Sequence, residues 1–319
     1  MAHDYTSIGF YTFDCLGRPV SELPPGNGTI FIDELTLAVS GAAGSAVIDG
    51  AKLGLDCLAV GAVGDDLMGD WVLQRIASFG IDTAMMQRSR TQGTSSSIVT
   101  TRPNGDRPAL HMKGATGDLW VDESLYDRVL DARVVHIGGA GLMNRMDGEP
   151  NARLLKEAKR RGCTTTLDVF AVTPEHLPII APLLPHVDYF LPSIEEAQAL
   201  SGLDDLDAVS GFFLERGCGC VVLTLGGDGA FYRHRDGQRF LTPAFDITVV
   251  DTCGCGDAFN AGFAAGLCTD LSMERTVALA QATSALVATG LGSQAGVRDY
   301  AQTLDMARSH PTRPSAYAP

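Results

Sequence analysis

Short apolar runs alternate with amphipathic stretches along most of the chain. The runs at 134–138, 164–168, 189–192 and 220–225 predict strands, and residues 151–162 predict an amphipathic basic helix that ends near a glycine. Strands that alternate with helices favour a parallel sheet covered on both faces. The pattern therefore predicts an α/β protein whose ligands bind beyond the carboxyl ends of the strands.

Two segments interrupt this alternation. Residues 14–34 hold glycine, proline and short apolar stretches, and residues 94–111 hold two strand-like runs around Asn104-Gly105, which is a hairpin signal. We expect the two segments to form a small antiparallel lid over the crevice. Residues 1–309 are then a single domain that carries these lid segments, and residues 310–319, which contain three prolines, are expected to be a loose tail.

Length, composition and charge indicate a globular protein and argue against some classes of partner. The chain has 319 residues, and its hydrophobic content of 45% indicates a globular protein. The formal charge of −14 argues against nucleic acid or an anionic membrane as a partner. No signal peptide is evident at the start, and the uncharged stretch 276–297 contains too many polar residues and glycines for a membrane span. A cytoplasmic protein is expected.

Residues 251–257, Asp-Thr-Cys-Gly-Cys-Gly-Asp, are the strongest candidate for chemistry. They join a predicted strand at 245–250 to a predicted helix at 257–267. A helix N-terminus attracts anions, and glycines let the backbone approach a phosphoryl group. An aspartate there can accept a proton from an attacking hydroxyl, so the segment suits phosphoryl transfer to an alcohol. The simpler alternative is an ordinary helix start with an acidic cap.

This segment resembles the C-terminal signature of the PfkB/ribokinase-like carbohydrate kinases, usually D-T-x-G-A-G-D, with Cys255 in place of the usual alanine. The resemblance implies a ribokinase-like, three-layer α/β/α fold with a mostly parallel central sheet and a small antiparallel β lid. It also implies that Asp257 is the catalytic base. The N–H groups of Gly254, Cys255 and Gly256 would form the anion hole for the γ-phosphoryl group of ATP.

Further segments resemble the N-terminal signature of the same family. Residues 51–54 and 61–69 match A-x-L-G and G-x-V-G-x-D-x-x-G, while residues 40–45 depart from G-G-x-x-x-N because serine replaces the first glycine and the asparagine. An aspartate that follows the first predicted strand, at 7–13, binds substrate hydroxyls in the family. The residues that the resemblance assigns to substrate binding are Asp14, Gly41, Ser45 and Asp168.

The resemblance also implies nucleotide and metal ligands. Glu196, in a segment similar to P-N-x-x-E, would hold Mg²⁺ through water, and Asp251 with Gly292 would bind a monovalent cation such as K⁺. The residues assigned to the nucleotide are Thr224, Gly226 and Gly229, in a turn similar to T-x-G-x-x-G, and Gln281, near adenine. An ordinary helix cap, a turn and a buried helix explain these metal and nucleotide residues equally well.

The function implied is ATP-dependent phosphorylation of a primary hydroxyl of a sugar or sugar-like molecule, by a homodimer joined through the lid. A nucleoside kinase of the same fold and a non-catalytic sugar- or nucleotide-binding sensor remain alternatives. A dinucleotide oxidoreductase is disfavoured because the G-x-G-x-x-G fingerprint is absent. The C-x-C pairs at 218–220 and 253–255 could in principle bind zinc, but reduced thiols are the favoured interpretation.

Overall fold

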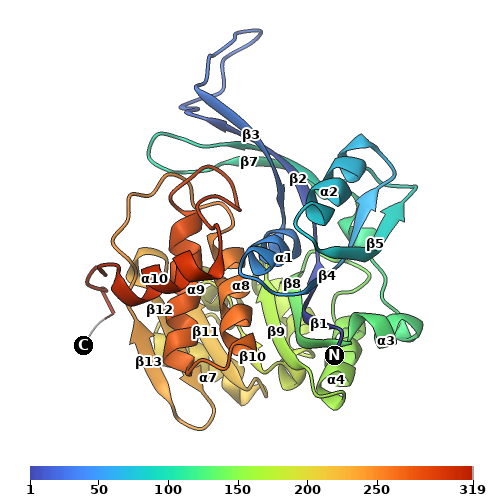
Figure 1. The fold of residues 1–319 in the computed structure, drawn as a ribbon, viewed down its shortest axis with the longest axis vertical. Coiled ribbons are helices and arrows are strands. Elements are labelled where there is room, and N and C mark those ends of the chain that lie inside the picture. The colour runs from blue at the N-terminus through green and yellow to red at the C-terminus, as the bar shows by residue number, and fades with distance from the viewer. Residues whose placement is uncertain (318–319) are drawn as a thin grey trace.

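A computed structural model describes residues 1–317, and it consists of a large central sheet with a smaller sheet above it (Figure 1). The central sheet has nine strands in the order β13-β12-β11-β10-β9-β8-β1-β4-β5. All neighbours from β11 to β5 pair in parallel, and β12 and β13 form an antiparallel edge. The strands are β1 (His3–Gly9), β4 (Cys57–Gly64), β5 (Asp82–Ser89), β8 (Ala132–Ala140), β9 (Thr164–Val169), β10 (Tyr189–Phe190), β11 (Cys220–Thr224), β12 (Ala230–His234) and β13 (Arg239–Thr242).

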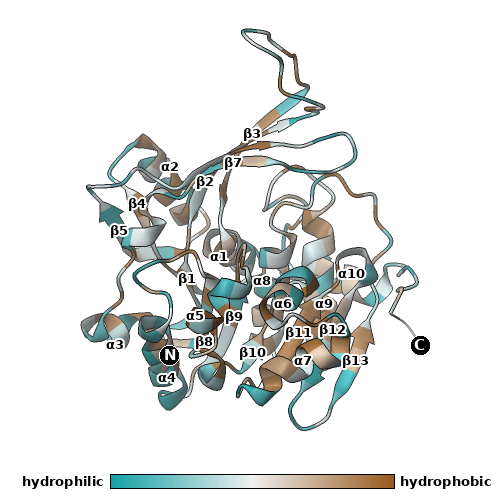
Figure 2. Cartoon of the chain, turned by 180° about the vertical axis from the view of Figure 1, so that it is seen from behind, coloured by the Kyte–Doolittle hydropathy of each residue, from teal (hydrophilic) through white to brown (hydrophobic). Residues whose placement is uncertain are grey.

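Helices cover both faces of this sheet, so the protein has three layers. Apolar residues gather where the helices meet the strands, whereas outward surfaces such as that of α4 are hydrophilic (Figure 2). One face carries α1 (Ala42–Lys52), α2 (Leu67–Ala77), α8 (Cys255–Cys268), α9 (Met273–Val287) and α10 (Tyr300–Ser309). The other carries α3 (Tyr126–Val129), α4 (Glu149–Arg160), α5 (Leu177–Ile180), α6 (Ile194–Ser201) and α7 (Leu206–Glu215). Short 3₁₀ turns are η1 (Gly114–Asp118), η2 (Glu123–Leu125), η3 (Pro174–His176), η4 (Leu184–His186) and η5 (Gly226–Asp228).

The predicted α/β architecture is confirmed, but one predicted strand is wrong. Residues 245–250 form no strand, and only Phe245 makes an isolated bridge, to Thr312. These β-branched residues follow the edge strand β13 and run over the helices, where no neighbouring strand is available to pair with them. Val249 is accordingly 47% exposed. Phe245 and Ile247 of this segment instead pack against α9 and α10.

The smaller sheet is the predicted lid. Its strands β2 (Thr12–Arg18), β3 (Glu34–Ser40), β6 (Ser96–Thr100) and β7 (Ala109–Met112) have the order β3-β2-β6-β7. It differs from a purely antiparallel lid because β2 and β6 pair in parallel. The reason lies in the central sheet: β2 follows β1 and β6 follows β5, and both belong to its parallel part. Residues 19–33 extend from this lid at the top of Figure 1.

Two segments near the chain ends lie elsewhere than their patterns suggest. The apolar run 7–13 is divided between β1 and β2, so Asp14 lies within a lid strand and not after the first strand. Within the tail expected to be loose, residues 311–313 run antiparallel to residues 244–246, and residues 318–319 fall outside the described part of the chain. None of the helices within residues 1–317 has the length and apolarity that a membrane crossing requires.

Candidate active site

A cavity of about 640 Å³ lies between the lid and the carboxyl ends of the central strands. Its roof comes from alternate residues of the lid strands, for example Ser97 and Val99 of β6 and His111 of β7. Its floor includes Asp168 at the end of β9, Thr224 at the end of β11 and the N-terminus of α8. The predicted crevice beyond the strand ends is therefore present.

The N-terminus of α8 opens directly into the cavity. Gly254 is its N-cap, with a left-handed φ of 76°, and a β-carbon there would overlap Ser293. A β-carbon on Gly256 would meet no atom within 4 Å, so it would project into the cavity. The N–H groups of the first turn of a helix have no intrahelical acceptor. The loop 254–256 thus presents a cradle of backbone N–H groups of the kind that suits an oxyanion, in which the N–H of Cys255 also makes a long bond of 3.4 Å to the carbonyl oxygen of Thr252.

Asp257 lies in the first turn of α8 and lines the same cavity. Burial raises the pKa of its carboxyl to about 6, against the lowering effects of the Ser45 hydroxyl and the Arg107 guanidinium. The charge of Asp14 raises this pKa further. A carboxylate of this pKa is ionised at neutral pH and more basic than an ordinary aspartate, which are the properties of a general base.

Asp14 faces the cavity from the lid. Its side chain is buried, and burial raises the pKa of its carboxyl while the hydroxyls of Thr12, Ser97 and Ser40 lower it. The Oδ1 atom is inaccessible and accepts no hydrogen bond from any atom of residues 1–317. A buried carboxylate oxygen without a donor is costly, and a hydroxyl group in the cavity would satisfy it.

Two further carboxylates lie close to Asp257. Burial raises the pKa of Asp168 well above its usual range, and the charges of Glu196 and Asp257 add to this effect. Burial also raises the pKa of Glu196, although its Oε2 accepts bonds from the N–H and hydroxyl of Ser193 in a capping box at the start of α6. Three adjacent carboxylates whose charged forms are disfavoured would be stabilised by a cation.

The side of the cavity that was predicted to hold nucleotide combines a glycine turn with an apolar slot. Thr224 and Gly226 line it, as does Gln281, whose Nε2 atom is buried without an acceptor among the described residues. Phe245, Ile247 and Ala285 supply the apolar wall. Gly229 lies behind the turn, where it packs against Thr242, and does not line the cavity.

Three other predicted site residues lie outside the cavity lining. Ser45 is buried in α1, and its hydroxyl, which has no hydrogen-bond partner among the described residues, lowers the pKa of Asp257. Asp251 accepts hydrogen bonds from the N–H groups of Cys253 and Gly292, both at 3.0 Å. Asp251 and Gly292 therefore brace the loop that precedes α8 against the loop after α9.

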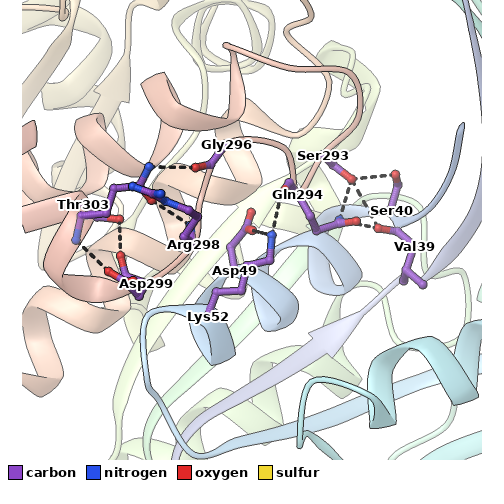
Figure 3. A network of polar contacts seen from close by, with 11 residues as sticks. Val39, Ser40, Asp49, Lys52, Ser293, Gln294, Gly296, Arg298, Asp299 and Thr303 are labelled. Atoms are coloured by element: carbon purple, nitrogen blue, oxygen red, sulfur yellow. Dashed lines mark hydrogen bonds and ion pairs between the residues drawn. The ribbon is translucent and has the colours of Figure 1, made fainter. Parts of the chain in front are cut away.

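A polar network ties the lid to this brace (Figure 3). The Nε2 atom of Gln294 donates to the carbonyl oxygen of Val39 at 2.5 Å, and the hydroxyls of Ser293 and Ser40 lie 2.9 Å apart. Lys52 of α1 donates to the carbonyl oxygen of Gln294 at 2.5 Å. Ser293 also touches Gly254, so the network links the base of lid strand β3 to the anion cradle.

Sequence reasoning missed two cationic residues of the cavity. Arg107 follows the hairpin turn of the lid, and its Nε donates to the hydroxyl of Thr252 at 3.0 Å. Arg313 comes from the segment that was expected to be a loose tail. In the sequence, Arg107 is marked only by its position next to the predicted hairpin turn. Charged residues at such turns are usually solvated, so this position does not indicate a site residue. No pattern pointed to Arg313.

The described residues contain no cluster of three or more His, Cys, Asp or Glu side chains that could hold a metal ion directly. The cysteines of the two C-x-C pairs are free thiols. Burial raises the pKa of Cys255 to about 12, so its thiol is neutral at physiological pH.

Comparisons with known proteins agree with this geometry. Residues 12–299 match the sequence profile of the pfkB family carbohydrate kinases. The chain is 23% identical over 277 residues to 2-dehydro-3-deoxygluconokinase of Bacillus subtilis, covering 83% of this chain and 85% of the relative. It is 24% identical over 276 residues to ribokinase of Haemophilus influenzae, covering 84% and 87%.

The fold is also similar to that of a solved structure, the Arabidopsis thaliana ribokinase complexed with ribose and ATP. The TM-score is 0.80 at 21% identity, over 97% of this chain and 100% of that one. The resemblance predicted from the two signatures is thus confirmed over nearly the whole sequence. The chain belongs to the pfkB family of carbohydrate kinases.

Proposed function

We propose that this kinase transfers the γ-phosphoryl group of ATP to a primary hydroxyl of a sugar or sugar-like molecule. The observation that carries the proposal is the position of Asp257, which lies in the cavity one residue beyond the glycine cradle and has a pKa of about 6. The carboxylate accepts the proton of the attacking hydroxyl. The N–H groups of the 254–256 loop stabilise the transferring phosphoryl group.

The substrate sits under the lid in this proposal. Asp14 and Asp168 accept hydrogen bonds from its hydroxyls, and the backbone of Gly41 contacts it, since all three line the cavity. The unpaired Oδ1 of Asp14 supports this arrangement. The sugar kinases among the relatives support a sugar over a nucleoside, which stays the alternative acceptor. A sensor without activity is disfavoured because binding alone does not require a base at Asp257.

The nucleotide occupies the side with the glycine turn and the apolar slot, with Thr224 and Gly226 near its phosphates and Gln281 near its base. Mg²⁺ fits this place because burial raises the pKa values of Asp168 and Glu196, and a cation would favour their ionised forms. Glu196 would hold the hydrated ion through water, and the ion would neutralise the phosphates. A K⁺ site is less well supported, because both oxygens of Asp251 already accept N–H groups.

We also propose a homodimer that forms through the lid. Ile98 and Leu110 are partners across β6 and β7 on the face opposite the cavity, with exposed fractions of 56% and 62%. Leu35, Leu37 and Met112 extend the same apolar surface. An exposed apolar sheet face of this kind is rarely left uncovered. A second lid packed on it would close the cavity from water.

A panel of sugars and nucleosides, assayed for ADP release with ATP and Mg²⁺, tests the activity. Asp257→Asn should lower kcat by about 10²–10⁴-fold while ATP binding persists. Asp270→Asn, the same change at an exposed position just beyond the other end of α8, is the matched control and should keep wild-type kcat. Turnover of Asp257→Asn above about a tenth of wild type would contradict the assignment of the base.

A further inference from the structure

The C-terminal segment is anchored beside the glycine turn of the cavity. The N–H of Asp246 donates to the carbonyl of Pro311, and the N–H of Arg313 donates to the carbonyl of Ala244, both at 2.9 Å. Further along, the N–H of Ala316 donates to Oδ1 of Asp228 at 2.6 Å. These bonds hold residues 311–316 along one side of the cavity at the end that we assign to nucleotide.

This anchoring brings the Arg313 side chain into the cavity. Its Nη1 atom lies 3.6 Å from the position that a β-carbon on Gly227 would occupy, so the guanidinium approaches the glycine turn. Its Nη2 atom makes a long contact of 3.4 Å with the carbonyl of Ile247. The Nε–H is buried and has no acceptor among the described residues. The guanidinium therefore keeps donor capacity that the protein does not use.

Arg313 is one of few positive charges in a cavity whose charged side chains are mainly acidic. Five carboxylates line the cavity, and among the described lining residues only Arg107 and Arg313 carry a fixed positive charge. Arg107 lies at the anion cradle, which leaves Arg313 as the cation at the glycine turn. The nearest carboxylate, Asp246, is 3.6 Å away and 70% exposed, so it neutralises Arg313 only weakly.

We propose that Arg313, delivered by the C-terminal segment, binds the phosphate groups of the nucleotide. The proposal rests on the function given above, since it requires the nucleotide at this end of the cavity. The planar guanidinium would donate to phosphate oxygens, which are its preferred partners. The segment 311–316 would then be a component of the nucleotide site.

Isothermal titration of ATP, ADP and adenosine against full-length variants tests the proposal. Arg313→Ala should weaken the binding of ATP and ADP about tenfold or more, because a hydrogen-bonded charge is lost, and should leave adenosine affinity unchanged. Arg313→Lys should restore part of the loss. Arg308→Ala, which removes an exposed arginine on α10, is the matched control and should bind all three ligands as the wild type does.

Two outcomes would overturn the proposal while leaving the kinase assignment intact. One is ATP affinity of Arg313→Ala within twofold of a wild type that binds ATP. The other is an equal loss for adenosine, which would place Arg313 against the base. Should Arg313→Ala not fold, Arg313→Gln, which keeps a polar group but no charge, must show the same loss of ATP affinity. A wild-type protein that binds no ATP would overturn the proposed function itself.

Discussion

The backbone of Gly254 lies against the side chain of Ser293, so that a β-carbon at position 254 would overlap Ser293. Gly254 is also left-handed, with φ of 76°. Both constraints act on the residue that begins the anion cradle, and Ser293 belongs to the network that reaches the lid strand β3. The shape of the cradle therefore depends on contacts behind it as well as on its own sequence.

Gly254→Ala should lower kcat by about 10²-fold or more, because the overlap moves backbone donors away from the phosphoryl group, and one lost oxyanion donor has an effect of this size. Steady-state kinetics with saturating ATP and substrate measure it.

Cys255→Ala is the control for that variant. It lies in the same loop and restores the residue that is usual in the family signature, and the neutral Cys255 thiol has no chemical role in the proposed reaction. Its kcat should stay within about twofold of wild type. Full activity in Gly254→Ala, or a large loss in Cys255→Ala, would contradict this account of the cradle.

The acid limb of the pH profile should report Asp257. Because its pKa is about 6, kcat/KM should fall as the pH decreases through this value and the base becomes protonated. The Arg107 charge lowers this pKa, so Arg107→Met should move the acid limb to higher pH. Arg102→Met, in the same hairpin but outside the cavity lining, should leave the limb in place. If the acid limb of Arg107→Met stayed at the wild-type pH, the assignment of that limb to Asp257 would be wrong.

Asp49 should reduce stability at neutral pH. It is fully buried in α1, neither of its oxygens has a hydrogen-bond partner among the described residues, and Lys52 is 4.0 Å away. Burial raises the pKa of its carboxyl. The folded protein therefore binds this proton more tightly than the unfolded chain, and stability is lost as the pH rises above the unfolded value of about 4.

Asp49→Asn removes this dependence. The variant should melt about 3–6 °C above wild type at pH 8, and the difference should shrink toward pH 4, as followed by calorimetry. Asp270→Asn, at an exposed site, should show no such trend. A variant that is less stable than wild type at pH 8 would mean that the Asp49 carboxylate has a favourable partner in solution.

Light scattering tests the lid dimer. A mass near twice the chain mass of 33.7 kDa is expected at micromolar concentration. Ile98→Glu or Leu110→Glu should split the dimer, because each places a charge in an apolar contact, and should raise KM for the sugar more than for ATP. Leu203→Glu, at an exposed residue in the turn between α6 and α7, on the other face of the central sheet, is the control. A mass near 33.7 kDa for the wild type would rule the dimer out.

The sequence predicted features that depend on local pattern. The strands β8, β9 and β11 and the start of α8 follow from apolar periodicity and glycine placement. The strand predicted at 245–250 is absent because the composition of this segment suits a strand but no strand of the sheet lies next to it to pair with. The position of Arg313 in the cavity could not be predicted, because it depends on the return of the chain end to residues 244–246. Contacts between distant segments leave no local signature.

The strand order of both sheets has a consequence for synthesis on the ribosome. Every strand except β1 and β2, which start the two sheets, pairs with at least one strand that precedes it in the chain: β4 and β8 join β1, and β3 and β6 join β2. The sheet can thus grow outward as the chain emerges, from the N-terminal side first. Asp257 and Arg313 are made after all thirteen strands, so a nascent chain has both sheets available before it can hold or use a nucleotide.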